Sequence, residues 1–266
     1  MKKVLLILTS VALLLCLTAC NANGFMSASK VKKLSDEFGT PQAEVSIKYT
    51  VNKQDIELRI TYNILLDKTP IAAISFINLV NAGFYNDAVL ETYDKNLNYI
   101  VGARYKYASE DEGKTYKYMQ NVETETFAGE FASNGYREPN GGYSAFKKLS
   151  LAMYHGGTAE DFNSGDGALI IATSSNTLRS SNYAVFAEMA ELSLYKDGNL
   201  SQRYDLQHLP DDIINPLRAT STSRTVTMRD GNTASKNILG GSSITRFVLS
   251  AKMLTEADWS KLPKVN

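Results

Sequence analysis

Few residues in this chain have the types and the spacing that catalytic or metal chemistry requires. The two histidines, His155 and His208, lie far apart and stand in no cluster of metal-ligating residues, so we expect neither a zinc site nor a histidine-based triad. Residues 161–172 begin like a calcium-binding loop. However, Gly165 occupies the fifth position, Asp166 replaces the required glycine at the sixth, and no carboxylate closes the loop at the twelfth. The sequence therefore predicts no metal ion and no cofactor.

One cysteine has a context that predicts covalent modification. The chain begins with Met-Lys-Lys and continues with an apolar run over residues 4–17, which is too short to span a bilayer comfortably and has the layout of a signal peptide. The run ends in Leu17-Thr18-Ala19-Cys20, which resembles the bacterial lipobox, where the cysteine is lipidated and becomes the new N-terminus. We expect residues 1–19 to be removed and Cys20 to hold the protein at a cell membrane as an extracytoplasmic lipoprotein. The alternative is an ordinary signal peptide followed by a chance cysteine.

Composition and charge narrow the remaining classes. The whole chain carries 28 basic and 28 acidic residues, and loss of residues 1–19 would leave a slight acidic excess. A surface so close to neutral offers no concentrated basic footprint for nucleic acid. Cys16 lies in the removed segment, so the mature protein has no second cysteine for a disulfide. The length fits one domain, which we place at residues 43–256, between a polar tether over residues 20–42 and a C-terminal tail over residues 257–266.

Local patterns predict a mainly β fold that opens with a hairpin and a helix. Apolar and polar residues alternate over residues 43–51 and again over residues 55–64, which indicates an antiparallel pair of half-buried strands. Pro70 then begins an apolar stripe of helical period that ends at Gly83, and we expect Thr69 to cap its N-terminus. Later apolar alternations, separated by loops rich in Gly, Asn and Ser, occur at residues 149–153, 168–171, 184–186 and 247–253.

Several short motifs follow one another along the chain. They are Asp67-Lys68-Thr69-Pro70, Phe76-Ile77-Asn78-Leu79-Val80, Gly83-Phe84-Tyr85, Gly129-Glu130-Phe131 with Asn134-Gly135, Leu149-Ser150-Leu151-Ala152-Met153, Asp161-Phe162-Asn163-Ser164 and Asn182-Tyr183-Ala184-Val185-Phe186. Together they resemble the motifs of the cyclophilin-type peptidyl-prolyl cis-trans isomerases over residues 43–255. The resemblance implies a closed eight-stranded antiparallel barrel capped by two helices, in which residues 103–126 and 196–240 are loop insertions.

A barrel of this kind assigns a side to each strand residue, because successive side chains alternate between its interior and its surface. Three residues are expected to face the interior: Ile47, Ile60 and Leu249. Three neighbours are expected to face water: Lys48, Arg59 and Ser250.

The same resemblance indicates where the catalytic residues of the family would stand. Family members use an arginine, framed by two glutamines, that hydrogen-bonds the prolyl amide and favours its twisted state. Here Thr92 stands at the arginine position, and Val101 and Ala168 stand at the glutamine positions. A threonine hydroxyl is uncharged and too short to replace a guanidinium. The candidates for a substitute are Arg104 and, as the better one, Arg179.

The remaining positions of the family's proline pocket are mostly apolar or aromatic in this chain. They are occupied by Leu97, Tyr99, Ile170, Leu178, Arg179 and Tyr183. Two outcomes stay open for them. They form a pocket that holds an apolar or prolyl side chain, or they pack together and fill it.

Two functions of different class follow from these residues. The first, which we favour, is a surface binding module that holds extended or prolyl segments of exported polypeptides with weak or no isomerase activity. The second is an active peptidyl-prolyl isomerase that assists the slow proline steps in the folding of exported proteins. The expected partners are therefore exported polypeptides and, through the lipid, a membrane. The oligomeric state is not specified by the sequence.

Overall fold

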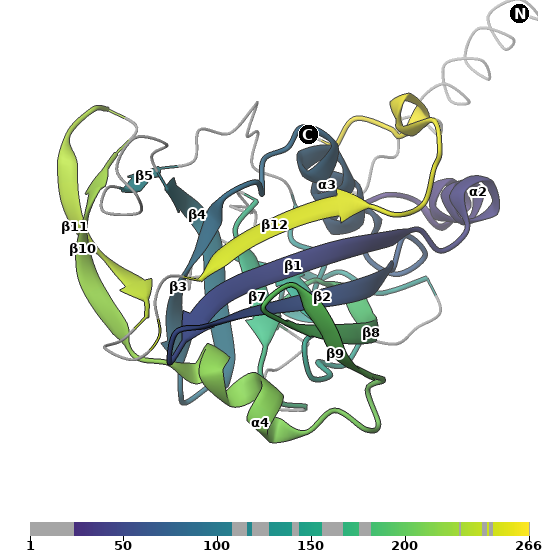
Figure 1. Ribbon diagram of the computed structural model, residues 1–266. Coiled ribbons are helices and arrows are strands. Elements are labelled where there is room, and N and C mark those ends of the chain that lie inside the picture. Colours follow the sequence, from purple (N-terminus) through teal and green to yellow (C-terminus); the bar gives the residue numbers. More distant parts are fainter. Residues whose placement is uncertain are drawn as a thin grey trace, which may run out of the picture.

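The computed structural model describes residues 24–107, 116–118, 128–139, 144–155, 167–175, 182–228, 230–240, 244 and 247–265. Within these ranges the chain is mainly β, as the alternating patterns predicted, and nearly all its strand pairs are antiparallel. Figure 1 shows the long strands curving past one another, with the helices outside them.

The predicted hairpin is formed by strands β1 (Gln42–Val51) and β2 (Gln54–Ile64). Asn52 and Lys53 make the turn, and both have a positive φ, of 50° and 65°. Two-residue turns of this kind match the right-handed twist of the strands that they join. Burial alternates along β2, because successive side chains of a strand point to opposite faces. The hairpin therefore presents one apolar face to the core.

Eight of the described strands close into a ring. Their order is β3 (Ala88–Asp94), β12 (Val248–Met253), β1, β2, β8 (Val185–Lys196), β6 (Leu151–Met153), β7 (Leu169–Ala172) and β4 (Tyr99–Tyr107), and β4 pairs in turn with β3. Each of these pairings is antiparallel. Closure removes the free edges that an open sheet would expose.

The interior of the ring is apolar, and the predicted sides of its strands are confirmed. Three side chains from three different strands are 0% exposed: Ile47, Ile60 and Leu249. Their neighbours point to the outer surface, where Lys48 is exposed and Arg59 and Ser250 are half-buried.

Helix α3 (Pro70–Asn81) follows the hairpin, as predicted, and is buried along most of its length. Thr69 is its N-cap residue, but the predicted capping hydrogen bond of the Thr69 side chain does not form. The hydroxyl donates to the carbonyl of Val185 at 2.9 Å instead. Glu130 caps the helix in its place, because Oε2 of Glu130 accepts a hydrogen bond from the amide of Ala72 at 3.0 Å.

The segment expected to be a tether is folded over much of its length. Helix α2 (Ala28–Phe38) carries Val31, Leu34 and Phe38 at helical spacing; Val31 and Leu34 are buried, and the ring of Phe38 stacks on that of Trp259 at 5.6 Å. The prediction of a tether through residue 42 is therefore wrong for residues 28–38. The predicted tail also packs onto the fold, since Trp259 lies within residues 257–266.

A further helical segment, α4 (Asp211–Ile214) continued by η4 (Asn215–Arg218), lies on the opposite side of the long strands from α3 in Figure 1. Its apolar side chains Ile214 and Leu217 are fully buried and join the main core. The short turns η1 (Ala132–Asn134) and η5 (Trp259–Lys261) complete the helical elements of the described ranges. In these ranges no helix has both the length and the apolar character needed to cross a membrane.

The two regions predicted to be insertions, residues 103–126 and 196–240, contain strands of their own. The strands are β5 (Tyr116–Tyr118), β9 (Asn199–Tyr204), β10 (Ser221–Thr227) and β11 (Thr233–Leu239). β9 pairs with β8, whereas β10 and β11 form a hairpin that pairs in parallel with β5, which itself pairs with β4. Figure 1 shows this hairpin curving away from the long strands. The two insertions therefore extend the sheet together.

Candidate functional site

Strand pairing brings two of the three substituted family positions together. Thr92 lies opposite Val101 in the β3–β4 pair, and Val101 lies opposite Ile170 in the β4–β7 pair. Ala168, at the third substituted position, is fully buried just before β7. It does not line the pockets described below. Thr92 and Val101 are thus the two substituted positions that a ligand could approach.

An open pocket of about 390 Å³ lies over Thr92, and we call it the Thr92 pocket. Its lining comes from β3, β4, the turn between them and one residue after β6: Thr92, Tyr93, Asp94, Lys95, Asn96, Tyr99, Val101, Arg104 and Tyr154. The turn is held by Asp94, whose Oδ1 accepts from the amides of Asn96 and Leu97 at 2.8 and 3.0 Å. The rim of the pocket is therefore fixed by local hydrogen bonds.

Apolar side chains beneath this pocket pack against one another. Tyr99, Val101 and Ile170 belong to one buried cluster with Phe146, and Tyr183 packs against it. The rings of Tyr99 and Tyr183 meet edge to face at 6.3 Å, and those of Phe146 and Tyr183 meet at 6.2 Å. These side chains therefore pack together beneath the Thr92 pocket, and two of them, Tyr99 and Val101, also line it.

The other predicted pocket residues do not join this cluster. Leu97 is 38% exposed in the turn between β3 and β4 and does not line the Thr92 pocket. Leu178 and Arg179 lie outside the described residues. The predicted pocket residues that the described structure brings together are therefore Tyr99, Ile170 and Tyr183.

Arg104 supplies the guanidinium of the Thr92 pocket, and a buried acid holds it. Its Nε donates to Oε2 of Glu91 at 2.7 Å, Nη2 lies 2.6 Å from the same oxygen, and the backbone amide of Arg104 donates to Oε1 at 2.9 Å. Glu91 is 2% exposed. Burial alone would lower the pKa of Arg104, but the charge and hydrogen bond of Glu91 raise it above its ordinary value. Arg104 is therefore permanently charged and held in place.

Irregular strand pairing accounts for the position of Arg104. The β3–β4 register shifts on both sides of Leu90, and Ala103 has a positive φ of 68°. Such irregularities redirect side chains. Gly102 permits the close approach of the two strands, because a Cβ there would lie 2.8 Å from Cδ2 of Leu90. The alternation of β4 alone would not have placed the guanidinium of Arg104 beside Thr92.

Three tyrosines from separate segments converge on the pocket, which sequence spacing did not reveal. Tyr93 lies one residue before the end of β3, Tyr99 begins β4 and Tyr154 follows β6. The Arg104 guanidinium lies over the Tyr154 ring, 4.8 Å from its centroid. Burial raises the pKa of Tyr99 well above its ordinary value, and Tyr183 adds to the effect. The Tyr99 hydroxyl therefore stays protonated at physiological pH.

The two histidines have structural surroundings. His155 is buried; its ring stacks on Phe131 at 4.8 Å, and its Nε2 lies 2.6 Å from the carbonyl oxygen of Asn182. His208 is exposed beside Asp205. The described ranges contain no group of His, Cys, Asp and Glu that could hold a metal ion. The first half of the segment that began like a calcium loop, residues 161–166, lies outside the described residues.

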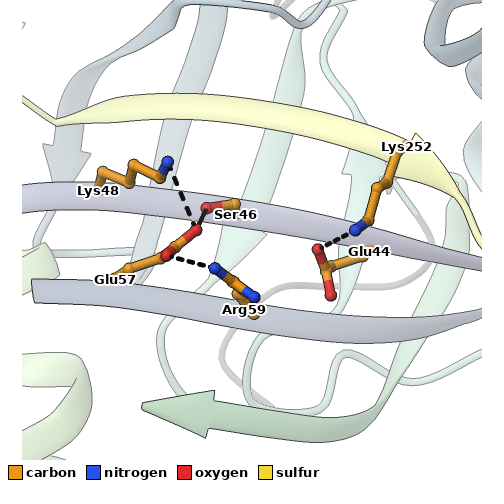
Figure 2. A network of polar contacts seen from close by, with 6 residues as sticks. All are labelled: Glu44, Ser46, Lys48, Glu57, Arg59 and Lys252. Carbon is orange, nitrogen blue, oxygen red and sulfur yellow. Dashed lines mark hydrogen bonds and ion pairs between the residues drawn. The ribbon is translucent and has the colours of Figure 1, made fainter. Parts of the chain in front are cut away.

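A second polar cluster lies on the outer face of β12, β1 and β2. It shares no residue with the lining of the Thr92 pocket. Figure 2 shows Glu57 at its centre, where it accepts from Ser46 at 2.6 Å and from Arg59 at 2.9 Å. Burial tends to raise the pKa of Glu57, but these hydrogen bonds, followed by the charge of Lys48, lower it overall. Beside it, Lys252 of β12 pairs with Glu44 of β1 at 3.0 Å. The cluster therefore links neighbouring strands and has the character of a structural network.

Comparison with known proteins gives a likeness of structure only. No family model matches the chain, and no curated protein matches it. Among solved structures it is similar to a cyclophilin type peptidyl-prolyl cis-trans isomerase of Cryptosporidium parvum, solved with and without the dipeptide Ala-Pro. For both structures the identity is 14%, the TM-score is 0.37 and the match covers 76% of this chain, with 98% and 97% of the other chain. At these values, function has to be inferred from the residues of the site.

Proposed function

We propose that this chain is a lipid-anchored, extracytoplasmic, cyclophilin-like protein that binds extended, proline-containing segments of exported polypeptides and has weak or no isomerase activity. In this proposal the ring of eight strands is the barrel of that family. The observation that carries it is the composition of the Thr92 pocket: aromatic side chains line it, and its guanidinium is held by Glu91.

The tyrosines of the pocket suit a prolyl ligand. Proline-rich segments are extended, carry few backbone donors and dock into grooves lined by aromatic side chains. Tyr93, Tyr99 and Tyr154 provide such rings around an open pocket of about 390 Å³. Arg104 and Asp94 add polar groups at its edge, which can receive the backbone of the segment. The pocket therefore has the features of a binding site without needing a nucleophile or a proton donor.

Catalysis of isomerisation requires more than binding. The barrier of about 18 to 20 kcal/mol comes from the partial double bond of the amide, so a catalyst has to stabilise the twisted amide more than the planar one. Thr92 carries no charge to do so. Arg104 is charged, but two of its side-chain nitrogens already face Glu91. Arg104 can therefore contact a bound segment, but a guanidinium fixed on Glu91 favours the twisted amide over the planar one only weakly.

A protease-coupled proline isomerisation assay on the soluble protein from residue 21 onward tests this proposal. We expect a rate at least about a hundredfold below that of an intact family member, since loss of one preorganised donor typically lowers the rate by about 10² to 10³. Losses within one site are not additive, so the factors for the three substitutions are not multiplied. Robust turnover that Arg179→Ala or Arg104→Ala abolishes would establish the alternative function, an active isomerase.

Peptide binding provides the positive test. Tyr154→Ala should weaken the binding of a short proline-containing peptide, measured by fluorescence or calorimetry, by about fivefold, because an aromatic contact contributes about 1 kcal/mol. Tyr195→Ala is the matched control. Tyr195 belongs to β8, its ring lies under the guanidinium of Arg59 of β2, and it does not line the Thr92 pocket. Equal binding by both variants would show that the Thr92 pocket is not the binding site.

The anchor is tested at Cys20. Cys20→Ser removes the thiol that the lipid requires, so the variant should be released from membranes or remain as an uncleaved precursor. More than one acyl chain on one residue gives stable attachment, whereas a single chain does not. Palmitate labelling that persists in Cys20→Ser would refute this part of the proposal.

A further inference from the structure

The β10–β11 hairpin creates a second pocket beside the first. Its volume is about 200 Å³, and its lining comes from β3, β4 and β11: Glu91, Thr92, Arg104, Tyr105, Lys236 and Asn237. We call it the hairpin groove. Thr92 and Arg104 line both pockets. A ligand in the Thr92 pocket therefore lies next to residues that the second insertion supplies.

The hairpin turns one definite face toward this groove. Val226 of β10 and Ile238 of β11 are buried in a cluster with Val89 and Tyr105 of the ring strands. Because side chains alternate along a strand, Lys236 lies on the same face as Ile238, and Arg224 on the same face as Val226. Both cations therefore belong to the face that is turned toward β3 and β4.

The charges on this face are not balanced within the protein. Arg224 lies directly opposite Lys236 in the β10–β11 pair, an arrangement in which like charges destabilise a hairpin. Glu91 is the one acid that lines the groove, and it faces Arg104. Among the described residues, neither Arg224 nor Lys236 forms an ion pair. Two cations at opposite positions of the hairpin, one of them lining the pocket, suit an anionic ligand.

The shape of the region favours an extended ligand. β11 is the last strand in the order of the sheet, and within the described ranges its outer edge pairs with no strand. An extended segment can follow such an edge and place alternate side chains into neighbouring pockets. The Thr92 pocket and the hairpin groove, which share two lining residues, provide two such pockets in succession.

We infer that the hairpin groove receives an acidic side chain of the bound segment, next to the proline. This inference rests on the proposed function and makes it more specific: the ligands are proline-containing segments with an aspartate or glutamate close to the proline. Lys236 and Arg224 select the acid by charge, whereas the tyrosines of the Thr92 pocket contact the prolyl part.

Two pairs of peptides test the inference on the soluble protein. In each pair, one blocked peptide carries two glutamates beside an Ala-Pro core, and the other carries two glutamines at the same positions. These two residues precede the core in the first pair and follow it in the second. We expect the glutamate peptide of at least one pair to bind about threefold to tenfold more tightly at low salt, as exposed ion pairs allow. High salt should abolish the difference.

A double variant locates the effect. Lys236→Gln with Arg224→Gln should remove the preference for glutamate and leave the binding of the glutamine peptides unchanged. The matched control, Lys252→Gln with Arg203→Gln, removes two cations that line neither pocket and should keep the preference. The variant hairpin should also be no less stable to denaturant than the natural one, because a like-charge pair has been removed.

The outcomes separate the two proposals. If none of the four peptides binds, the proposed function fails, and this inference fails with it. If the members of both pairs bind equally well, the binding function stands and the inference about the groove is wrong. A glutamate preference that survives in the double variant, or that the control variant loses as well, also overturns the inference, because the acid is then recognised elsewhere or by overall charge.

Discussion

The interior of the ring and the Thr92 pocket on its outside are built from the same strands, yet they differ in chemistry. On β4, Ile100 faces the main core, whereas its neighbours Tyr99 and Val101 belong to the outer cluster; on β7, Leu169 faces inward and Ile170 outward. Inward positions are restricted to apolar residues by close packing. Outward positions are less restricted: Tyr99, Val101 and Ile170 also pack together, but the polar Thr92 and Arg104 lie beside Tyr99 and Val101. The same strands therefore carry an apolar core on one side and a pocket with polar groups on the other.

The largest loss of stability is expected from a substitution in the interior of the ring. Ile60→Ala should lower the free energy of unfolding by about 2 to 5 kcal/mol, because it removes buried methyl and methylene groups and leaves a cavity. Chemical denaturation measures the loss. Lys48→Ala, on the exposed face of the neighbouring strand, should stay within about 0.5 kcal/mol of the natural protein. Similar losses in the two variants would contradict the assigned sides of the strands.

Loss of the ion pair between Glu91 and Arg104 should have the next largest effect on stability. This pair lies between the interior of the ring and the Thr92 pocket. Glu91→Gln leaves Arg104 without its anionic partner in a partly buried place, which should cost about 1 to 3 kcal/mol of stability. Glu188→Gln is the matched control, because Lys147 and Glu188 also form a pair at 2.7 Å but are more exposed. Denaturation curves that show the same small loss for both variants would mean that Glu91 does not hold Arg104 in place.

Glu130 is the polar exception inside the fold, and it predicts a pH dependence. Burial raises the pKa of Glu130 to about 8, although the amides of Ala72 and Ile71 lower it in part. The folded state therefore holds a proton that the unfolded state releases near its ordinary pKa of 4.5. This contribution to stability is complete below that value and is lost as the pH rises toward 8.

Between pH 6 and pH 7, the free energy of unfolding should accordingly fall by up to about 1.4 kcal/mol through this one group. Glu130→Gln, which cannot ionise, should flatten the decline. Glu37→Gln, at an exposed position in α2, should leave it unchanged. Denaturant midpoints measured at several pH values decide the matter, and a decline of equal slope in Glu130→Gln would exclude Glu130 as its source.

The smallest effect is expected on the outer face shown in Figure 2. Arg59→Ala removes one partner of Glu57, but the Arg59 side chain is half-exposed, so the loss should not exceed about 1 kcal/mol and should shrink at high salt. Arg203→Ala, which breaks a looser pair with Glu191 at 3.8 Å, should change stability even less. A loss as large as that of Ile60→Ala would show that this face contributes to stability as the interior does.

Local sequence patterns were sufficient for the elements whose partners are near in the chain. The period of two over β1 and β2 and the helical stripe of α3 are complete within each segment, so both elements were predicted. The stripe of Val31, Leu34 and Phe38 was also present, but the surrounding polar residues favoured a tether. The pairing of β5 with β10 could not be predicted, because it joins two insertions through contacts that neither encodes alone.

The candidate site was predictable in position but not in chemistry. The resemblance to the cyclophilin family placed Thr92 and Val101 at one site, and strand pairing brings them together. The pairing of Arg104 with Glu91 depends on a shift in strand register, and register shifts leave no trace in local periodicity. Tyr154 reaches the pocket from another strand entirely, so its role follows only from the three-dimensional arrangement.

The pairing of β1 with β12 has a consequence for biosynthesis. Ala43 lies opposite Met253, so the ring closes only when both ends of the domain are present, across a loop of roughly 200 residues. Contacts between such distant segments make folding slow. A chain that is exported N-terminus first would thus remain open, and fit to be threaded, until its final strand has left the translocation channel. In the export that we propose, the topology of the ring itself would delay folding until the last strand has passed.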